Sequence, residues 1–527
     1  MKRAVALLMA ASMVLGLCGC GSKTAETKEA VATTQAQAGE TSAAKESDSQ
    51  PSEKPVEISM LLIQYNQPPR EDGEFWKWME STYGVDLKIE WVAESSYNDR
   101  LALALSTGDI PDIVQIPQTT AAPVVNAVNS GLLKDLTPYL DFDKYENLGK
   151  ISSASWTNSK IDGKYYVFPR SRGQYNVCLF LRGDMLDQMN MEVPSTIDEL
   201  TEYFRGIKAL QPDMIPLPME VDTITSFAAG AFGPGEILPV FTEDKTGIID
   251  HHLTDAYADC IEWLSELYAE GLYASEFALY KTDRNQEVVL AGKGGARHQN
   301  VWHRYRLSTE LQKAVPDGYF VPCFGVSTDK GQTVEYDAGL YGGYGVSADV
   351  SEEKLLKILD FYNSTSDPEM YNTFTYGLEG TYWNMVDGFP KLTELGNKEV
   401  TNSFYGPYVR ATFLYDKVDS PLADADYNKE TREMVKKVDE LAANIDGAPF
   451  KLFNIISSNA WSEWWSVNKG EFEGYVADTI TGKHSIEDFR KYQADILALD
   501  EIQTANKEYK ASYDSFGLAD FKLPEMN

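Results

Sequence analysis

The sequence predicts an α/β protein whose folded part has two lobes. Between residues 58 and 116, buried strands alternate with amphipathic helices. This order is typical of a mostly parallel sheet that is covered by helices on both faces. The chain has 527 residues, which is too long for one ordinary hydrophobic core. Two lobes are therefore expected.

The first alternating segment holds three strands and two helices. The predicted strands are residues 58–64, 85–92 and 113–116, and the predicted helices are residues 75–83 and 97–106. Ligands of such open sheets bind at the carboxyl ends of the strands. Because Tyr65 and Asn66 directly follow the first strand, we predict that both line a cleft.

Further strands and helices follow along the chain. Strands are predicted at residues 177–181 and 341–346, and helices at residues 254–270 and 351–362. Thr196 with Glu199 has the spacing of a capping box, and so does Ser485 with Asp488, so a helix is expected to start after each. Gly271 is expected to end the helix before it.

The first twenty residues have the organisation of a secretory signal. Lys2 and Arg3 precede an apolar run at residues 4–17, which is too short for a lasting membrane span. The run ends in Cys18-Gly19-Cys20, which resembles a bacterial lipobox. That resemblance implies a signal peptide at residues 1–19 and a diacylated Cys20 as the mature N-terminus, with palmitate as a typical acyl group. An ordinary signal with soluble release is the alternative.

Residues 20–55 are predicted to be the acylated cysteine and a disordered linker. Residues 21–54 contain no aromatic residue, no leucine and no isoleucine, so they cannot bury enough apolar surface to order themselves. The linker would hold the folded body off the outer face of the membrane. The chain carries a formal net charge of −33. This charge argues against binding nucleic acid or anionic lipid headgroups, and solubility explains it equally well.

The sequence contains no strong signal for a disulfide framework, a metal site or a cofactor. Cys178, Cys260 and Cys323 are widely spaced and form no CxxC pair. The sequence does not decide whether two of them form one disulfide bond. His251 and His252 are adjacent, so we expect them to point to different sides and to be a poor metal pair. Residues 424–428 have EF-hand spacing but lack the turn glycine, and a solvated loop is predicted there.

Ordered motifs from residue 97 onward resemble family 1 extracellular solute-binding proteins, the capture subunits of ABC importers. The strongest is YNDRL at residues 97–101 with GDIPDIV at residues 108–114. The others, in the order of that family, are DGKYY at 162–166, LRGDML at 181–186, PSTIDEL at 194–200, LAGK at 290–293, YGLEG at 376–380 and ITGK at 480–483. The resemblance covers the chain from about residue 58 to its end. It is strongest to the long lipoprotein members that bind uronide and other oligosaccharides.

The resemblance implies a type II periplasmic-binding-protein-like fold, with mixed sheets flanked by helices and a ligand cleft between two lobes. By chain order, lobe one would hold residues 56–169 and 341–389, and lobe two residues 170–340 and 390–527. The lobes would close on a carbohydrate and deliver it to an ABC permease, with the protein acting as a monomer. Some uronide-binding relatives carry a calcium loop, but residues 208–216 are short and contain one acid, so no calcium site is expected.

Candidate ligand contacts are aromatic and cationic side chains. Sugar recognition needs flat aromatic faces and planar polar groups. Near motifs that the family places by the cleft lie Trp302, Tyr344, Tyr376, Glu379 and Trp383. Instead of contacting a ligand, each aromatic residue could pack in the hydrophobic core, and Glu379 could stabilise the turn in which it lies.

An acidic sugar is the sharper hypothesis for the ligand. The segment 297–306 contains three arginines, His298 and His303, and no acid, and Arg170 and Arg172 flank the expected crossing between the lobes. The guanidinium groups of Arg170, Arg172 and Arg304 would bind the carboxylate or sulfate groups of such a sugar. The alternative is that these arginines pair with the chain's own carboxylates.

Two other functions are weighed against solute capture. A surface glycoside hydrolase needs two carboxylates across a cleft. With 80 acidic residues in the chain, the sequence does not exclude such a pair. However, the chain has no GxSxG, HExxH, P-loop or Gly-rich dinucleotide motif. The third candidate is a binding protein that reports to a sensor kinase instead of a permease.

Overall fold

The computed structural model describes residues 54–65, 67–172, 177–280, 282–335, 339–400, 410, 420–442 and 451–517. All of them belong to one unit, Glu53–Asn527. The predicted signal peptide, Cys20, nearly all of the predicted linker and Asn66 lie outside the described residues. In the described part of the chain, none of the helices combines the length and apolar character that a membrane crossing requires.

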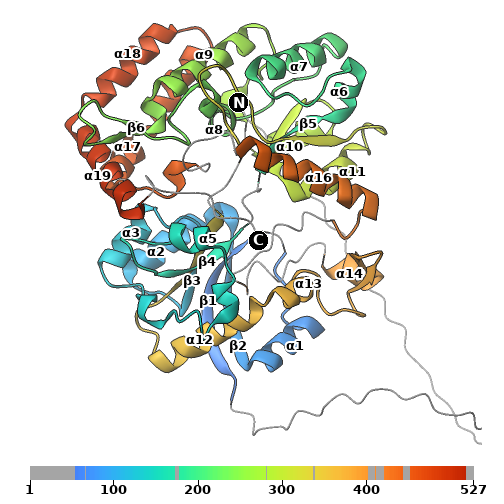
Figure 1. The fold of residues 1–527 in the computed structure, drawn as a ribbon, viewed down its shortest axis with the longest axis vertical. Coiled ribbons are helices and arrows are strands. Elements are labelled where there is room, and N and C mark those ends of the chain that lie inside the picture. The colour runs from blue at the N-terminus through green and yellow to red at the C-terminus, as the bar shows by residue number, and fades with distance from the viewer. Residues whose placement is uncertain are drawn as a thin grey trace, which may run out of the picture. The chain divides into compact units, whose positions relative to one another are not determined.

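A five-stranded mixed sheet organises the N-terminal part (Figure 1). Its strands, in spatial order, are β2 (Val85–Ala93), β1 (Val56–Gln64), β3 (Ile113–Ile116), β10 (Leu340–Val346) and β4 (Val167–Ser171). As predicted, β1 runs parallel to both β2 and β3. The late strand β10 is antiparallel to β3 on one side and to β4 on the other.

Alternate residues of β1 enter two different cores. Ile58, Met60 and Leu62 pack on one face, together with helices α1 (Glu74–Tyr83) and α12 (Glu352–Thr365). Leu61 and Ile63 pack on the opposite face, against α2 (Glu94–Thr107) and α3 (Ala122–Asn129). Since both faces of the sheet bury apolar side chains, the sequence of β1 is a nearly continuous hydrophobic run. The smaller helices of this part are α4 (Glu146–Gly149), α5 (Ser153–Asn158), α13 (Tyr371–Tyr376) and α14 (Glu394–Glu399), with η1 (Thr137–Tyr139) and η6 (Pro368–Met370).

Glycines allow β10 to enter the sheet between β3 and β4. The register shifts between Leu340 and Gly343, which marks a bulge. Gly342 has a φ of 62°, and a Cβ there would lie 1.8 Å from the carbonyl oxygen of Ile116. A Cβ on Gly343 would lie 2.4 Å from the carbonyl oxygen of Phe168. Side chains at these positions would push the strands apart. The bulge also changes the direction of the preceding Tyr341 side chain.

A second, three-stranded sheet lies in the middle of the chain. Its order is β8 (Ala296–Asn300), β5 (Val177–Arg182) and β9 (Phe320–Cys323), and both pairings are antiparallel. The helices of this segment are α6 (Gly183–Met189), α7 (Ile197–Leu210), α8 (Val221–Ala228), α9 (Asp255–Ala269), α10 (Thr282–Leu290) and α11 (Arg304–Leu311). Its short pieces are η2 (Ala229–Phe232), β6 (Val240–Phe241), β7 (Ile248–Ile249), η3 (His251–Leu253), η4 (Phe277–Leu279) and η5 (Val301–His303).

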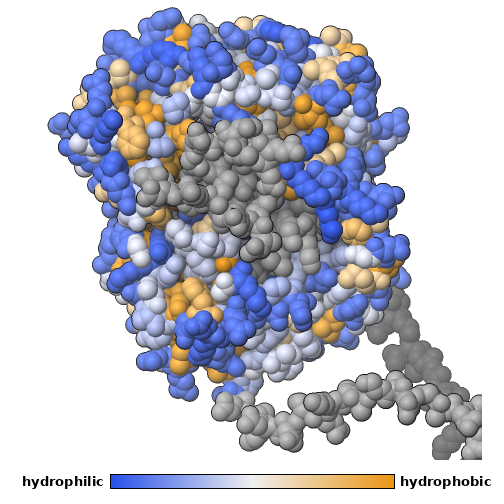
Figure 2. Space-filling view, viewed as in Figure 1, coloured by the Kyte–Doolittle hydropathy of each residue, from blue (hydrophilic) through white to orange (hydrophobic). Residues whose placement is uncertain are grey.

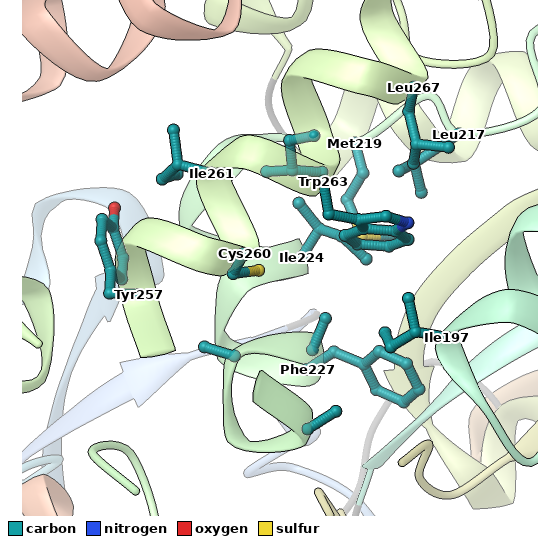
Figure 3. Packing of buried hydrophobic residues seen from close by; sticks show 14 of the residues in the cluster. Ile197, Leu217, Met219, Ile224, Phe227, Tyr257, Cys260, Ile261, Trp263 and Leu267 are labelled. Atoms are coloured by element: carbon teal, nitrogen blue, oxygen red, sulfur yellow. The ribbon is translucent and has the colours of Figure 1, made fainter. Parts of the chain in front are cut away.

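The C-terminal helices share a core with the middle of the chain. They are α17 (Asn459–Ile480), α18 (Ile486–Leu497) and α19 (Asp500–Phe516), preceded by η7 (Leu452–Asn454). Phe472, Phe489 and Ile502 belong to the same buried cluster as α7, α8 and α9. Figure 3 shows how Trp263 and Cys260 of α9 lie beside Ile224 and Phe227 of α8 in that cluster.

Several predicted helix ends are confirmed. Thr196 Oγ1 accepts a hydrogen bond from Glu199 N, and the Glu199 carboxylate accepts one from Thr196 N, which completes the capping box of α7. Ser485 and Asp488 do the same for α18. Gly271 follows α9 with a φ of 71°. Cys178, Cys260 and Cys323 are buried and free, so none of these three described cysteines forms a disulfide.

Two predictions need correction. Residues 424–428 are not a loop, because α16 (Ala425–Ala442) begins there and Tyr427 N donates to Asp424 Oδ1 at 2.8 Å. His251 and His252 do not point apart, since the short turn η3 places their ring centroids 3.9 Å from each other.

The division into two lobes stays a prediction. The hairpin of β11 (Trp383–Val386) and β12 (Phe389–Leu392) includes the predicted boundary at residue 389, and Val400 packs with the first core.

The surface is mainly polar, as the net charge of −33 suggests. The face in Figure 2 is largely hydrophilic, with small hydrophobic patches between polar residues. Exposed apolar side chains such as Leu279 and Val467 occur on α-helical and loop surfaces at 69% and 81% exposure. Scattered residues of this kind are normal for a folded protein.

Asp112, in the GDIPD motif, ties three elements together. Its Oδ2 accepts hydrogen bonds from Ser59 N at 2.7 Å and Ser59 Oγ at 2.8 Å on β1. The same oxygen accepts one from Lys354 Nζ of α12 at 2.5 Å. The motif therefore joins the start of β3 to its neighbouring strand and to a covering helix.

Replacing Asp112 should destabilise the fold, whereas replacing its neighbour Asp109 should not. Asp112→Ala removes the charged acceptor of these bonds, and we expect the free energy of unfolding to fall by about 2 kcal/mol. Asp109 belongs to the same motif but is exposed, so Asp109→Ala should change it by less than about 0.5 kcal/mol. Urea unfolding measures both variants. Equal losses would contradict the role assigned to Asp112.

Candidate ligand site

A buried arginine at the end of β4 forms the centre of the candidate site. Arg170 is 6% exposed. Its Nη1 donates to the hydroxyl of Tyr65 at 3.0 Å, and its guanidinium carbon lies 5.5–5.8 Å from the ring centroids of Tyr65, Tyr341 and Tyr344. Within the described residues, Arg170 has no ion pair with a carboxylate. The neighbouring tyrosines raise the pKa of Arg170 overall, although burial alone would lower it.

Two hydrogen bonds orient the Tyr65 hydroxyl so that its own proton can be donated to a ligand. It accepts one hydrogen bond from Arg170 and another from Gln115 Nε2 at 2.8 Å. Gln115 is fully buried, and its Oε1 accepts the N–H of Ile63 at 3.1 Å, which fixes the orientation of the amide. With two bonds accepted, the hydroxyl has its own proton to donate. Tyr65 and Arg170 therefore present donors side by side.

Arg172 extends this group toward the second sheet. Its guanidinium carbon lies 4.3 Å from the Tyr341 ring centroid and 5.7 Å from that of Trp302, on η5. Its backbone N–H donates to Gly339 O at 2.7 Å, so the end of β4 is fixed beside the start of β10. Tyr341 thus lies between both arginines. Cation–π contacts of this kind hold guanidinium groups in a fixed plane.

Positive charge accumulates next to Trp302. Burial, together with the charges of Arg306, Arg297 and Arg172, lowers the pKa of His303 to about 3. His303 is therefore neutral at physiological pH, while the surrounding guanidinium groups remain charged. This part of the molecule is locally cationic even though the chain is strongly acidic.

A hollow of about 210 Å³ opens beside β8. It is lined by residues of β5, α8, α10 and β8 and the turn before α8, namely Val177, Met219, Glu220, Thr223, Asn285, His298 and Gln299. Trp302 and His303 follow the same strand along the chain. The lining combines amide, hydroxyl, imidazole and carboxylate groups, which suits hydroxyl-rich ligands.

Behind this hollow, Glu335 anchors His298. Glu335 is 2% exposed, and its Oε1 lies 3.1 Å from His298 Nε2 and 3.5 Å from Lys451 Nζ. Burial would raise the pKa of Glu335, but Lys451 and His298 lower it to about 2. The carboxylate is therefore ionised and orients the imidazole that lines the hollow.

Four of the predicted site residues lie elsewhere. Arg304 is buried and bonds Phe320 O, Thr431 Oγ1 and Glu430, so it joins α11 to α16. Tyr376 and Trp383 are buried in the first core. The Trp383 indole, for example, donates to Gly377 O at 2.7 Å. Glu379 is exposed in the turn before β11. For these side chains the structural alternative fits their positions, and they are not part of the proposed site.

From the predicted set, the structure brings together Tyr65, Arg170, Arg172, Trp302, His303 and Tyr344, whose buried ring lies against Arg170. Sequence reasoning missed Gln115 and Tyr341. Gln115 had a signal, because it is a polar residue inside the otherwise apolar strand β3. Tyr341 had none, since its direction depends on the bulge of β10.

Comparison with known proteins identifies the family. A model described as bacterial extracellular solute-binding protein matches residues 77–381. The chain belongs to this family, and it is accordingly a non-enzymatic, extracellular solute-binding component of transport.

Individual relatives agree with this assignment. The polygalacturonan/rhamnogalacturonan-binding protein YtcQ of Bacillus subtilis is 26% identical over 62% of this chain and 67% of its own length. Lipoprotein LipO of the same organism is 24% identical over 63% of this chain and 68% of its own. A solved solute-binding protein of Bifidobacterium longum infantis, described as HMO binding and ABC-transporter associated, covers 88% of this chain and 99% of its own, with a TM-score of 0.67 and 16% identity. That structure confirms the predicted fold.

Glu335 should make stability depend on pH in the acid range. Its pKa is about 2 in the folded protein, against an ordinary value of 4.5. Ionised Glu335 therefore stabilises the fold above about pH 4.5, and this contribution is lost as the pH falls toward about 2. Glu335→Gln should flatten the acid decline in the free energy of unfolding, as measured by urea unfolding between about pH 5 and about pH 3.

The matched control is Glu310→Gln, which alters an exposed ion pair with Lys313. It should leave the slope with pH close to that of the unmodified protein. An unchanged slope in Glu335→Gln would show that Glu335 is not the titrating group.

Proposed function

We propose that this protein captures an acidic oligosaccharide outside the cell and delivers it to an ABC permease, while a lipid on Cys20 anchors it to the membrane. The observation that carries the acidic ligand is Arg170, a buried arginine with tyrosine partners and no carboxylate partner in the described residues. A buried cation without an anion is unfavourable. A ligand carboxylate would complete the pair.

The geometry of the site supports a carbohydrate. The Tyr341 and Trp302 rings offer apolar faces for the C–H side of a sugar ring, and the arginines hold both rings in place. The Tyr65 hydroxyl and the Arg170 guanidinium offer adjacent donors to one carboxylate. The names of two relatives, a polygalacturonan-binding and an HMO-binding protein, support the same class of ligand.

A matched pair of ligands tests the proposal. We expect an oligogalacturonate to bind the purified protein, and its fully methyl-esterified form to bind about 10- to 100-fold more weakly, because the ester removes the charge and keeps the sugar. Tyr65→Phe and Arg172→Gln should weaken binding of the acid by a similar factor and binding of the ester much less. Isothermal titration calorimetry measures all of these affinities.

Arg100→Gln is the control variant, since Arg100 pairs with Glu90 on the surface of α2 and β2. It should leave both affinities unchanged. Equal affinity for acid and ester, or full affinity in Tyr65→Phe and Arg172→Gln, would reject an acidic ligand and leave a neutral oligosaccharide.

The lipid anchor is tested separately. In cells fed radiolabelled palmitate, we expect label on the unmodified protein and its recovery with membranes. Cys20→Ala should carry no label and appear in the medium, because the acceptor thiol is gone. Cys18→Ala, two residues away, should remain labelled. Label that persists in Cys20→Ala would contradict the anchor.

A further inference from the structure

A group of metal-binding side chains lies far along the chain from the candidate ligand site. Asp250, His251 and His252 follow β7 and start η3. One oxygen or nitrogen from each lies within 4.8 Å of the others, and no other group of three was found among the described residues. The Asp250 side chain is 3% exposed, that of His251 22% and that of His252 17%.

His251 has a buried nitrogen without a hydrogen-bond partner. That atom is Nδ1, which lies 3.6 Å from Asp250 Oδ1. The other ring nitrogen, Nε2, lies 3.4 Å from Glu236 Oε2. When Nε2 carries the proton and faces Glu236, Nδ1 presents a lone pair toward Asp250. An imidazole backed by a carboxylate in this way is the usual arrangement of a metal-binding histidine.

The other two side chains are also held in position. His252 Nδ1 lies 2.7 Å from Asp250 Oδ1. Tyr509, on α19, donates its hydroxyl to Asp250 Oδ2 at 3.0 Å. Gln493, on α18, donates to the backbone carbonyl of His252 at 2.8 Å. The C-terminal helices thus fix both the carboxylate and the turn.

We propose that Asp250 Oδ1, His251 Nδ1 and His252 Nδ1 bind one divalent transition-metal ion, with Zn²⁺ as the best fit. Two imidazole nitrogens and one carboxylate oxygen match the ligand preference of Zn²⁺, while Ca²⁺ and Mg²⁺ prefer oxygen alone. A water molecule would fill the fourth position. On binding, His252 adopts the neutral tautomer with its proton on Nε2, so that its Nδ1 lone pair is available, and two metal–ligand bonds replace its hydrogen bond to Asp250.

The ion would stabilise the contact between the turn and the C-terminal helices. His252 packs on Trp465 of α17 with ring centroids 4.6 Å apart, and His251 packs on Phe453 at 5.0 Å. Fixing both rings to Asp250 therefore fixes η7, α17 and α19 against the buried cluster that includes α7, α8 and α9. This role is structural and does not depend on the proposed ligand.

Metal titration of the purified protein, treated with EDTA and dialysed, tests the site. We expect Zn²⁺ at a hundredfold excess over its dissociation constant to raise the unfolding temperature by about 2–5 °C. Co²⁺ should bind at one ion per chain, show the intense visible absorption of a four-coordinate site, and be displaced by Zn²⁺. Absence of both effects would overturn the proposal.

Variants locate the ion. His251→Ala should lose the Co²⁺ absorption and the thermal shift, whereas His484→Ala, a histidine stacked on Tyr475, should keep both. If His251→Ala fails to fold by circular dichroism, His252→Gln is judged by the same criteria. Retention of the Co²⁺ absorption in a folded His251 or His252 variant would place the metal elsewhere and overturn the proposal.

Discussion

The return of β10 into the first sheet is the constraint on which the rest of the structure depends. The chain leaves this sheet through β4 and comes back between β3 and β4, about 170 residues later. Backbone contacts at Gly342 and Gly343 are too close for any Cβ. The bulge that these glycines permit turns Tyr341 toward Arg170 and Arg172. One topological requirement therefore positions both the crossing strands and the candidate ligand site.

The buried arginines of this protein are stabilised by different kinds of partner. Arg182 pairs with Asp184 through two hydrogen bonds, and Arg304 pairs with Glu430. Carboxylates are abundant, with 80 acidic against 47 basic residues. Arg170 nevertheless has tyrosine partners, which leave its charge uncompensated. Since removing a charge from water is unfavourable without a counter-ion, an anionic ligand gives this arrangement a physical reason.

Local patterns predicted the elements well, and the site only in part. The apolar run of β1, the capping boxes at Thr196 and Ser485 and the end of α9 at Gly271 depend on near neighbours, so the sequence predicts them. The bond between Gln115 and Tyr65 joins residues 50 apart, so near neighbours do not predict it. The His251–His252 pair was misjudged because opposed side chains are expected of extended backbone, whereas a 3₁₀ turn brings the rings together.

The residues of the proposed ligand site belong to two different buried clusters, so ligand binding depends on how close these clusters are to each other. Tyr65 belongs with the first core, whereas Trp302 packs with the cluster of β5 and β9. Arg172 contacts Tyr341 and Trp302 together, so it is shared by both sides. A ligand can shift a conformational equilibrium only by binding one state more tightly than another. A sugar acid bound as proposed between Arg170 and Trp302 would make all of its contacts only when both sides approach it, and so it would favour the state in which both sides are closest.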